Sequence, residues 1–90
     1  MRTIREVMDM DVCNLELSVR CLNCMRNMNI KKLCEVTALS KDDFLKMRNF
    51  GHKSIHELDG KLKEIGLWWQ MNDRDWLNWG MHHIEWIKTH

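Results

Sequence analysis

The segment NFGHKSIHEL, Asn49 to Leu58, decides the fold that this sequence predicts. After Gly51, apolar residues recur at helical spacing, namely Ile55, Leu58, Leu62 and Ile65. We therefore expect a helix over 52–65. The first N–H groups of a helix have no intrahelical acceptor and lie at the positive end of its dipole. A glycine at that end lets a ligand approach the backbone, so this helix start is typical of an anion site.

Shorter helices are predicted on both sides of this one. Ser18 is a good N-cap for a helix with an apolar stripe of Val19, Leu22 and Met25, which ends near Asn27 or Asn29. Further helices are expected over 31–37 and 41–47, the latter opened by a capping box of Ser40 and Asp43. RNFG, residues 48–51, is the connector to the helix over 52–65. Short helices, a glycine turn and a helix that begins with Lys-Ser are the pattern of a helix–hairpin–helix.

Two glycines qualify the prediction for the long helix. Gly66, followed by Leu67, is the expected C-terminal cap. Gly60 lies in the middle of the helix, where glycine costs about 1 kcal/mol relative to alanine. A close contact with another helix at Gly60 would explain its presence.

The two ends of the chain differ from this central part. Residues 1–14 are expected to be a leader with a helical turn around Ile4–Met8, and residues 15–74 to be the domain. All five tryptophans fall in the C-terminal part, where one helix over 75–88, capped by Asp73 or Asp75, is expected. We expect it to pack through Trp76, Leu77 and Ile84. Trp79 and Trp86 would then either form a partner-contact surface or serve as additional core.

Composition limits the class of protein. Ninety residues suffice for one domain, and 44% hydrophobic with 30% charged residues is typical of a globular chain. No apolar run is long enough to span a membrane, and acids near the N-terminus argue against a secretory signal, so a cytoplasmic protein without membrane contact is expected. The net charge is only +1, so any contact with DNA must use a few local cations and backbone dipoles.

Cysteine and histidine patterns give no sign of an enzyme. Cys13, Cys21, Cys24 and Cys34 contain a single C-x2-C, which favours buried thiols in a reducing compartment over a metal site or disulfides. His82 and His83 are adjacent, so on a helix they point about 100° apart and are poorly placed to share a metal ion. No nucleophile–base pair is visible. We therefore expect no catalytic residues, no metal and no cofactor.

Two blocks of sequence resemble a known family. LELSVRCLNCM at 15–25 and FGHKSIHEL at 50–58 are similar to the C-terminal domain of the bacterial RNA polymerase α subunit. That family has L-E-L-[ST]-V-R-x-x-N-C-L followed, at the same separation, by L-G-x-K-S-L-x-E-I. The similarity continues through Gly66, Leu67, Met71 and Trp76, and so covers about residues 12–76.

The resemblance implies a fold and a function. The fold would be an all-α, compact bundle of four to five short helices containing the helix–hairpin–helix (a SAM-like arrangement), here with an extra C-terminal Trp-rich helix. The function would be binding to the minor groove of AT-rich DNA, together with contacts to transcription factors, the sigma factor or RNA polymerase.

The resemblance also assigns roles to matching residues. Arg20 would enter the minor groove, with Asn23 and Cys24 beside it at the DNA backbone. Gly51, Lys53 and Ser54 would hold phosphates, and Glu57 would orient the basic side chains. His52 lies at the same helix start, where its charged form would strengthen anion binding.

A second hypothesis stays open. It is a protein-interaction module with the same fold that associates through the Trp-rich tail, self-association included, with DNA binding weak or lost. The low net charge favours this alternative, whereas Arg20, Asn23, Lys53 and Ser54 favour DNA binding.

Overall fold

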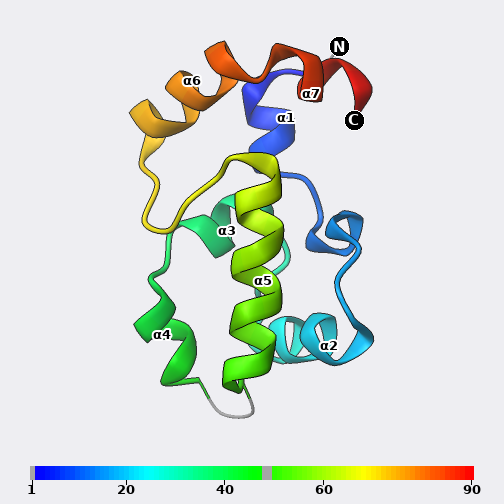
Figure 1. Ribbon diagram of the computed structural model, residues 1–90, viewed down its shortest axis with the longest axis vertical. Helices are drawn as coiled ribbons and strands as arrows, with labels where there is room; N and C mark the ends of the chain where they lie inside the picture. The colour runs from blue at the N-terminus through cyan, green and yellow to red at the C-terminus, as the bar shows by residue number, and fades with distance from the viewer. Residues whose placement is uncertain (1, 48–49) are drawn as a thin grey trace.

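The computed structural model describes residues 2–47 and 50–90, so Arg48 and Asn49 of the predicted connector lie outside the described residues. Within the described residues the protein is all-helical, as predicted, with no strand and one isolated antiparallel bridge between Asp11 and Lys32. The helices are α1 (Ile4–Met8), the 3-10 turn η1 (Val12–Leu15), α2 (Val19–Asn27), α3 (Leu33–Thr37), α4 (Lys41–Leu45), α5 (His52–Ile65), α6 (Asp73–His82) and α7 (Ile84–Thr89). Figure 1 shows α5 as the central helix, with α2 and α4 beside its beginning and α6 and α7 beyond its end.

The N-terminal segment is part of the fold. Val7 is completely buried, Val12 is nearly so, and both belong to the same hydrophobic core as α5. The backbone of this segment is tied to the start of α3, because Val12 N–H donates to the Lys31 carbonyl and Leu33 N–H to the Met10 carbonyl, both at 2.9 Å. Residues 1–14, expected as a leader, thus supply a short helix and core side chains.

The buried face of α2 differs from the predicted stripe. Ser18 caps the helix and Asn27 ends it, as predicted. Cys21 and Met25, however, are completely buried, whereas Val19 is 73% exposed. The prediction for Val19 was wrong because Cys21, one turn before Met25, takes the inward position and turns Val19 outward.

α5 follows its prediction closely. Its buried side chains include Ile55, Leu58, Leu62 and Ile65. Gly66 ends the helix in the left-handed conformation at φ 84°, and Leu67 N–H donates to the Leu62 carbonyl at 2.8 Å. Gly60 is exposed, and a Cβ built there would meet no atom within 4 Å, so the expected close helix contact is not at this position.

The C-terminal part consists of two helices rather than the predicted single one. Asn72, and not Asp73 or Asp75, is the N-cap of α6: its side chain accepts from the Asp75 N–H, while the Asp75 carboxylate accepts from the Asn72 N–H. His83, at φ −130° and ψ 36°, breaks the helix between α6 and α7. The His83 ring stacks on Trp79 with 4.9 Å between centroids, which fixes the break against the preceding turn.

The packing face of the tail was also predicted wrongly in part. Trp76 is buried as expected, but Trp79 is only 1% exposed, and its indole N–H donates to the Ile65 carbonyl at 2.9 Å. Trp86 is half-buried against the core. Leu77 is instead 60% exposed and Ile84 48%. Trp79 therefore cannot serve as the partner-contact surface, because its ring is inside the protein.

The tail packs onto the N-terminal helix at a glycine. Gly80 of α6 is buried, and a Cβ built on it would overlap the end of the Ile4 side chain on α1. Glycine here allows α6 and α1 to approach closely. The two termini meet at the same end of the molecule, where Arg2 Nε donates to the His90 carbonyl at 2.5 Å (Figure 1).

Candidate nucleic-acid interface

The N-terminus of α5 is capped differently from most of the other helices. α1, α2, α4 and α6 each begin with a residue whose side chain accepts a hydrogen bond from the first turn. α5 begins after Gly51, which has no side chain to accept one. The Gly51 backbone is extended, with φ −89° and ψ 174°, and a Cβ there would meet no described atom within 4 Å. The glycine thus leaves open space at the positive end of the longest helix, where an external anion can approach.

The first turn of α5 presents two basic residues to solvent. His52 and Lys53 are exposed. Ser54 is only 7% exposed, and its carbonyl accepts a weak hydrogen bond from Cys21 Sγ at 3.9 Å. Of these three residues, Ser54 is therefore the one that faces α2 and the interior.

The first turns of α2 supply the other part of the surface. Arg20 and Asn23 are both exposed and lie three residues apart, so they share one side of the helix. Cys24 is half-buried beside them. Cys21 is completely buried, and burial, with smaller effects of Glu57 and Cys24, raises the pKa of its thiol to about 12. Cys21 is thus a neutral core residue that joins α2 to α5, as expected for a buried thiol.

Glu57 fastens the two helix starts together. Its Oε2 accepts from the Ser18 backbone N–H at 2.5 Å and its Oε1 from the Ser18 hydroxyl at 2.8 Å. The same hydroxyl oxygen accepts from the Cys21 N–H at 3.2 Å, and so caps α2. Glu57 therefore acts on the cap of the helix that carries Arg20. Sequence reasoning missed this partner, because 39 residues separate Glu57 from Ser18 and no local pattern connects them.

The predicted DNA-binding residues thus come from two helix starts that lie together. Ser18–Glu57 and Cys21–Ser54 hold the beginning of α2 against the first turns of α5. The result is an exposed surface that carries Arg20, His52 and Lys53, while the Glu57 carboxylate is engaged by Ser18. Such a surface can bind phosphates by charge and by backbone N–H groups. In residues 2–47 and 50–90, no group of three or more His, Cys, Asp or Glu side chains is placed to hold a metal ion.

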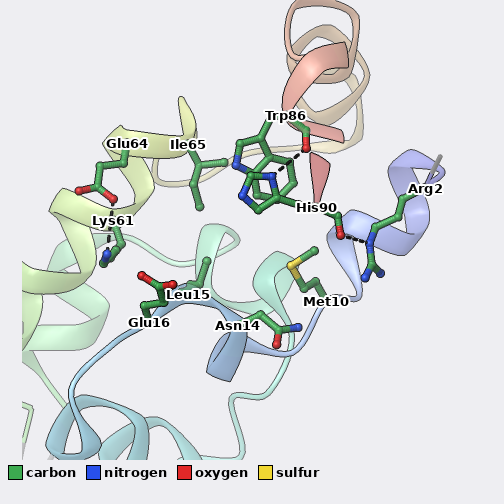
Figure 2. A pocket seen from close by; sticks show the side chains of 10 residues that line it. All are labelled: Arg2, Met10, Asn14, Leu15, Glu16, Lys61, Glu64, Ile65, Trp86 and His90. Atoms are coloured by element: carbon green, nitrogen blue, oxygen red, sulfur yellow. Dashed lines mark hydrogen bonds and ion pairs between the residues drawn. The ribbon is translucent and has the colours of Figure 1, made fainter. Parts of the chain in front are cut away.

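A pocket of about 420 Å³ lies at the other end of α5 (Figure 2). Three of its charged side chains contact neighbours: Lys61 pairs with Glu64 at 3.5 Å, and Arg2 donates to the His90 carbonyl. The His90 ring stacks on Trp86 with 4.3 Å between centroids. This pocket shows no convergent set of acid, base and nucleophile, so it does not suggest a catalytic site.

The structure is a small all-α domain in which the starts of α2 and α5 lie together. Residues 2–64 match the family described as the C-terminal domain of the bacterial RNA polymerase alpha chain, and this protein belongs to that family. The family is a DNA-binding, transcription-associated part of the polymerase and is not its catalytic part. In the described part of the sequence, no helix is long and apolar enough to cross a membrane.

Known relatives are longer proteins. The sequence is 44% identical over 68 residues to the DNA-directed RNA polymerase subunit alpha of Clostridium botulinum, a match that covers 76% of this protein and 22% of that one. It is 38% identical over 68 residues to the same subunit of Desulfitobacterium hafniense, with the same coverage. The 68 matched residues thus span about a fifth of the length of these relatives.

A solved structure has the same fold. The NMR structure of the C-terminal domain of the RNA polymerase alpha subunit from Helicobacter pylori matches with a TM-score of 0.67 at 23% identity. The match covers 91% of this protein and 74% of that one, so the shared fold extends beyond the residues of the family match.

Proposed function

We propose that this protein binds the minor groove of AT-rich DNA through the starts of α2 and α5, in the cytoplasm and in association with the transcription machinery. The observation that carries the proposal is the joining of these two helix starts by Glu57 and Ser18. It supports the proposal because the candidates for groove reading, on α2, and for phosphate binding, on α5, belong to the two helix starts that this contact joins.

The two helix starts would have different roles in binding DNA. Arg20 and Asn23 would enter the minor groove, since a narrow A-tract groove attracts arginine and asparagine can reach its acceptors. The open N-terminus at Gly51, with Lys53 and His52, would hold phosphates and fix the register without reading sequence. Cys24 and Ser54 would line the junction between the two parts. Contacts to transcription factors, the sigma factor or RNA polymerase would then use faces that DNA leaves free.

Alanine variants test this division. Arg20→Ala should weaken binding to an AT-rich duplex by about 1–3 kcal/mol and reduce the preference over a GC-rich duplex. Lys53→Ala should weaken binding to both duplexes about equally and reduce the salt slope by about 1. Fluorescence anisotropy over a salt series measures both effects.

Arg26→Ala is the matched control for Arg20. Arg26 is also exposed on α2, lies in its last turn, and loses the same charge. Its removal should leave the preference for AT-rich DNA unchanged. Equal losses for the Arg20 and Arg26 variants would show that only overall charge matters and would exclude the proposed groove contact.

A further inference from the structure

An apolar groove lies where α1, α6 and α7 meet, at the end of the molecule away from α2 (Figure 1). Its volume is about 480 Å³, which is within the range of pockets that bind small molecules. Three apolar side chains along it are exposed to water, since Leu77 is 60% exposed, Met81 73% and Ile84 48%. Contiguous exposed apolar surface of this kind often marks a binding site.

The lining of this groove is aliphatic and comes from all three helices. The Ile4 side chain of α1 lies against Gly80, and Ile87 of α7 is 5% exposed, so these two form the inner part of the lining. Leu77 and Met81 of α6 stand at the open side. No aromatic ring of the described residues lines the groove. Such a lining suits an alkyl chain better than a planar ring, which gains from stacking on aromatic side chains.

The two polar residues that line the groove can both donate hydrogen bonds. Among the described residues of the lining, Arg2 alone is charged. Its Nε donates to the His90 carbonyl at 2.5 Å, and no carboxylate in the described part of the chain lies within ion-pair distance of its guanidinium. The Thr3 hydroxyl accepts from the Glu6 N–H at 3.1 Å, which leaves its own proton to donate. A guanidinium beside a hydroxyl is suited to a carboxylate.

We propose that this groove binds a medium-chain fatty acid, with its carboxylate on Arg2 and its alkyl chain between α1, α6 and α7. The alkyl chain would remove apolar surface of Leu77, Met81 and Ile84 from water, which is the main source of binding energy for such a ligand. Arg2 and Thr3 would fix its direction in the groove. The proposal does not rest on the proposed DNA binding, because it concerns the other end of the molecule.

The surroundings of the groove favour a small amphiphile over a protein segment. Exposed residues of both signs precede and follow the apolar residues in the sequence, namely Asp73 and Arg74 before them and the ion pair of Glu85 and Lys88 after them. These charges would not select a protein segment of one sign. A stable protein interface also buries about 800 Å² of each partner, whereas this groove has three exposed large apolar side chains.

Titration of the full 90-residue protein with monomeric decanoate, followed by the NMR signals of its methyl groups, tests the proposal. The wild type should bind with a Kd of about 0.1–1 mM, as expected for a ligand of this size, and the signals of Ile4, Leu77 and Met81 should shift. Octanoate should bind about four- to fifteenfold more weakly, because it buries two fewer methylene groups. The absence of shifts up to about 5 mM decanoate overturns the proposal. Binding to phosphatidylglycerol vesicles without binding to decanoate also overturns it.

Variants of Arg2 test the position of the carboxylate. Arg2→Gln should weaken decanoate binding about three- to tenfold and remove the preference for decanoate over decanol, whereas Arg2→Lys should keep that preference. Arg74→Gln is the matched control, since Arg74 is exposed on α6 but does not line the groove. Equal affinity of the wild type and the Arg2→Gln protein for decanoate overturns the assignment of the carboxylate to Arg2.

Variants of exposed leucines test the groove itself. Leu77→Gln should weaken decanoate binding at least about threefold, because it replaces an apolar wall by an amide. Leu45→Gln is the control, since Leu45 is 41% exposed on α4 and does not line the groove. Equal losses in the two variants overturn the groove as the site, and circular dichroism confirms that each variant is folded. Binding of the Leu77→Gln protein to AT-rich DNA should be unchanged, which separates failure here from failure of the proposed function.

Discussion

Replacing Glu57 distinguishes positioning from simple electrostatics. An acid beside a phosphate-binding surface would ordinarily oppose DNA binding, so its removal by charge alone should strengthen binding. Glu57 accepts two hydrogen bonds from Ser18, however, and thereby holds the start of α2 against α5. Glu57→Ala should therefore weaken binding to AT-rich DNA, because Arg20 loses its fixed position.

The magnitude follows from the contacts. A hydrogen bond to a charged acceptor contributes about 1.5–3 kcal/mol when buried, but Ser18 is exposed and water can replace the lost acceptor. We expect Glu57→Ala to lower the free energy of unfolding by about 1–2 kcal/mol in total. For a domain of this size that corresponds to a fall in Tm of about 4–16 °C. DNA affinity should fall about three- to tenfold when measured at a temperature where both proteins are folded.

Glu57→Gln separates two ways in which Glu57 can act. Glutamine can still accept from the Ser18 N–H and donate to its hydroxyl, so α2 stays in place while one negative charge is lost. If Glu57 acts through Ser18, this variant should bind AT-rich DNA at least as tightly as the wild type. If it acts by orienting basic side chains, as the family resemblance implies, both variants should weaken binding alike.

Anisotropy titrations and urea denaturation of the three proteins provide the measurement. Replacing Ser18 by alanine in the wild type and in the Glu57→Ala protein completes a double-mutant cycle. The coupling energy between the Ser18 hydroxyl and Glu57 should be about 0.5–1 kcal/mol. A Glu57→Ala protein that is folded and binds DNA more tightly than the wild type would refute the positioning role.

Three further changes test the packing and charge of the fold. Trp79→Ala should lower the free energy of unfolding by about 3–5 kcal/mol because its ring is in the core, whereas Trp68→Ala, at a side chain 40% exposed, should cost clearly less in urea denaturation. Equal costs would contradict the observed burial. Gly60→Ala should raise stability by about 0.5–1 kcal/mol, since the site is open and helical; a lower Tm would argue against that open site. Burial alone would raise the pKa of Asp59, but hydrogen bonds from Trp69, Lys63 and Lys41 outweigh it and hold that pKa below its ordinary value. Ionised Asp59 therefore stabilises the folded protein at neutral pH, and this stabilisation is lost as pH falls below about 4. The urea midpoints of wild type and Asp59→Asn should converge there.

Features set by nearby residues could be predicted from the sequence. Ser18 and Ser40 cap helices, Gly66 ends α5, and the apolar period of α5 gives its buried face, because each depends on residues within one or two turns. Features set by distant contacts could not. The tail is apolar nearly all round, so its period alone cannot choose between Leu77 and Trp79. Trp79 takes the buried position because its indole N–H donates to the Ile65 carbonyl and because Gly80 packs against Ile4.

The candidate site shows the same limit. The residues at the starts of α2 and α5 could be named from their motifs, and their roles on DNA stay predictions. What the sequence lacked was the connection between them, since Glu57 and Ser18 belong to different blocks and neither motif requires the other.

The meeting of Arg2 with His90 has a practical consequence for tethering the domain. A fusion partner, a linker or a surface attachment at either terminus would leave from the end of the molecule remote from α2 and the start of α5 (Figure 1). Immobilisation through either terminus should then present the same face to a passing duplex. A bulky fusion would at the same time crowd Leu77 and Met81. The termini are also close enough for a short peptide to join them, which makes the protein suitable for circular permutation.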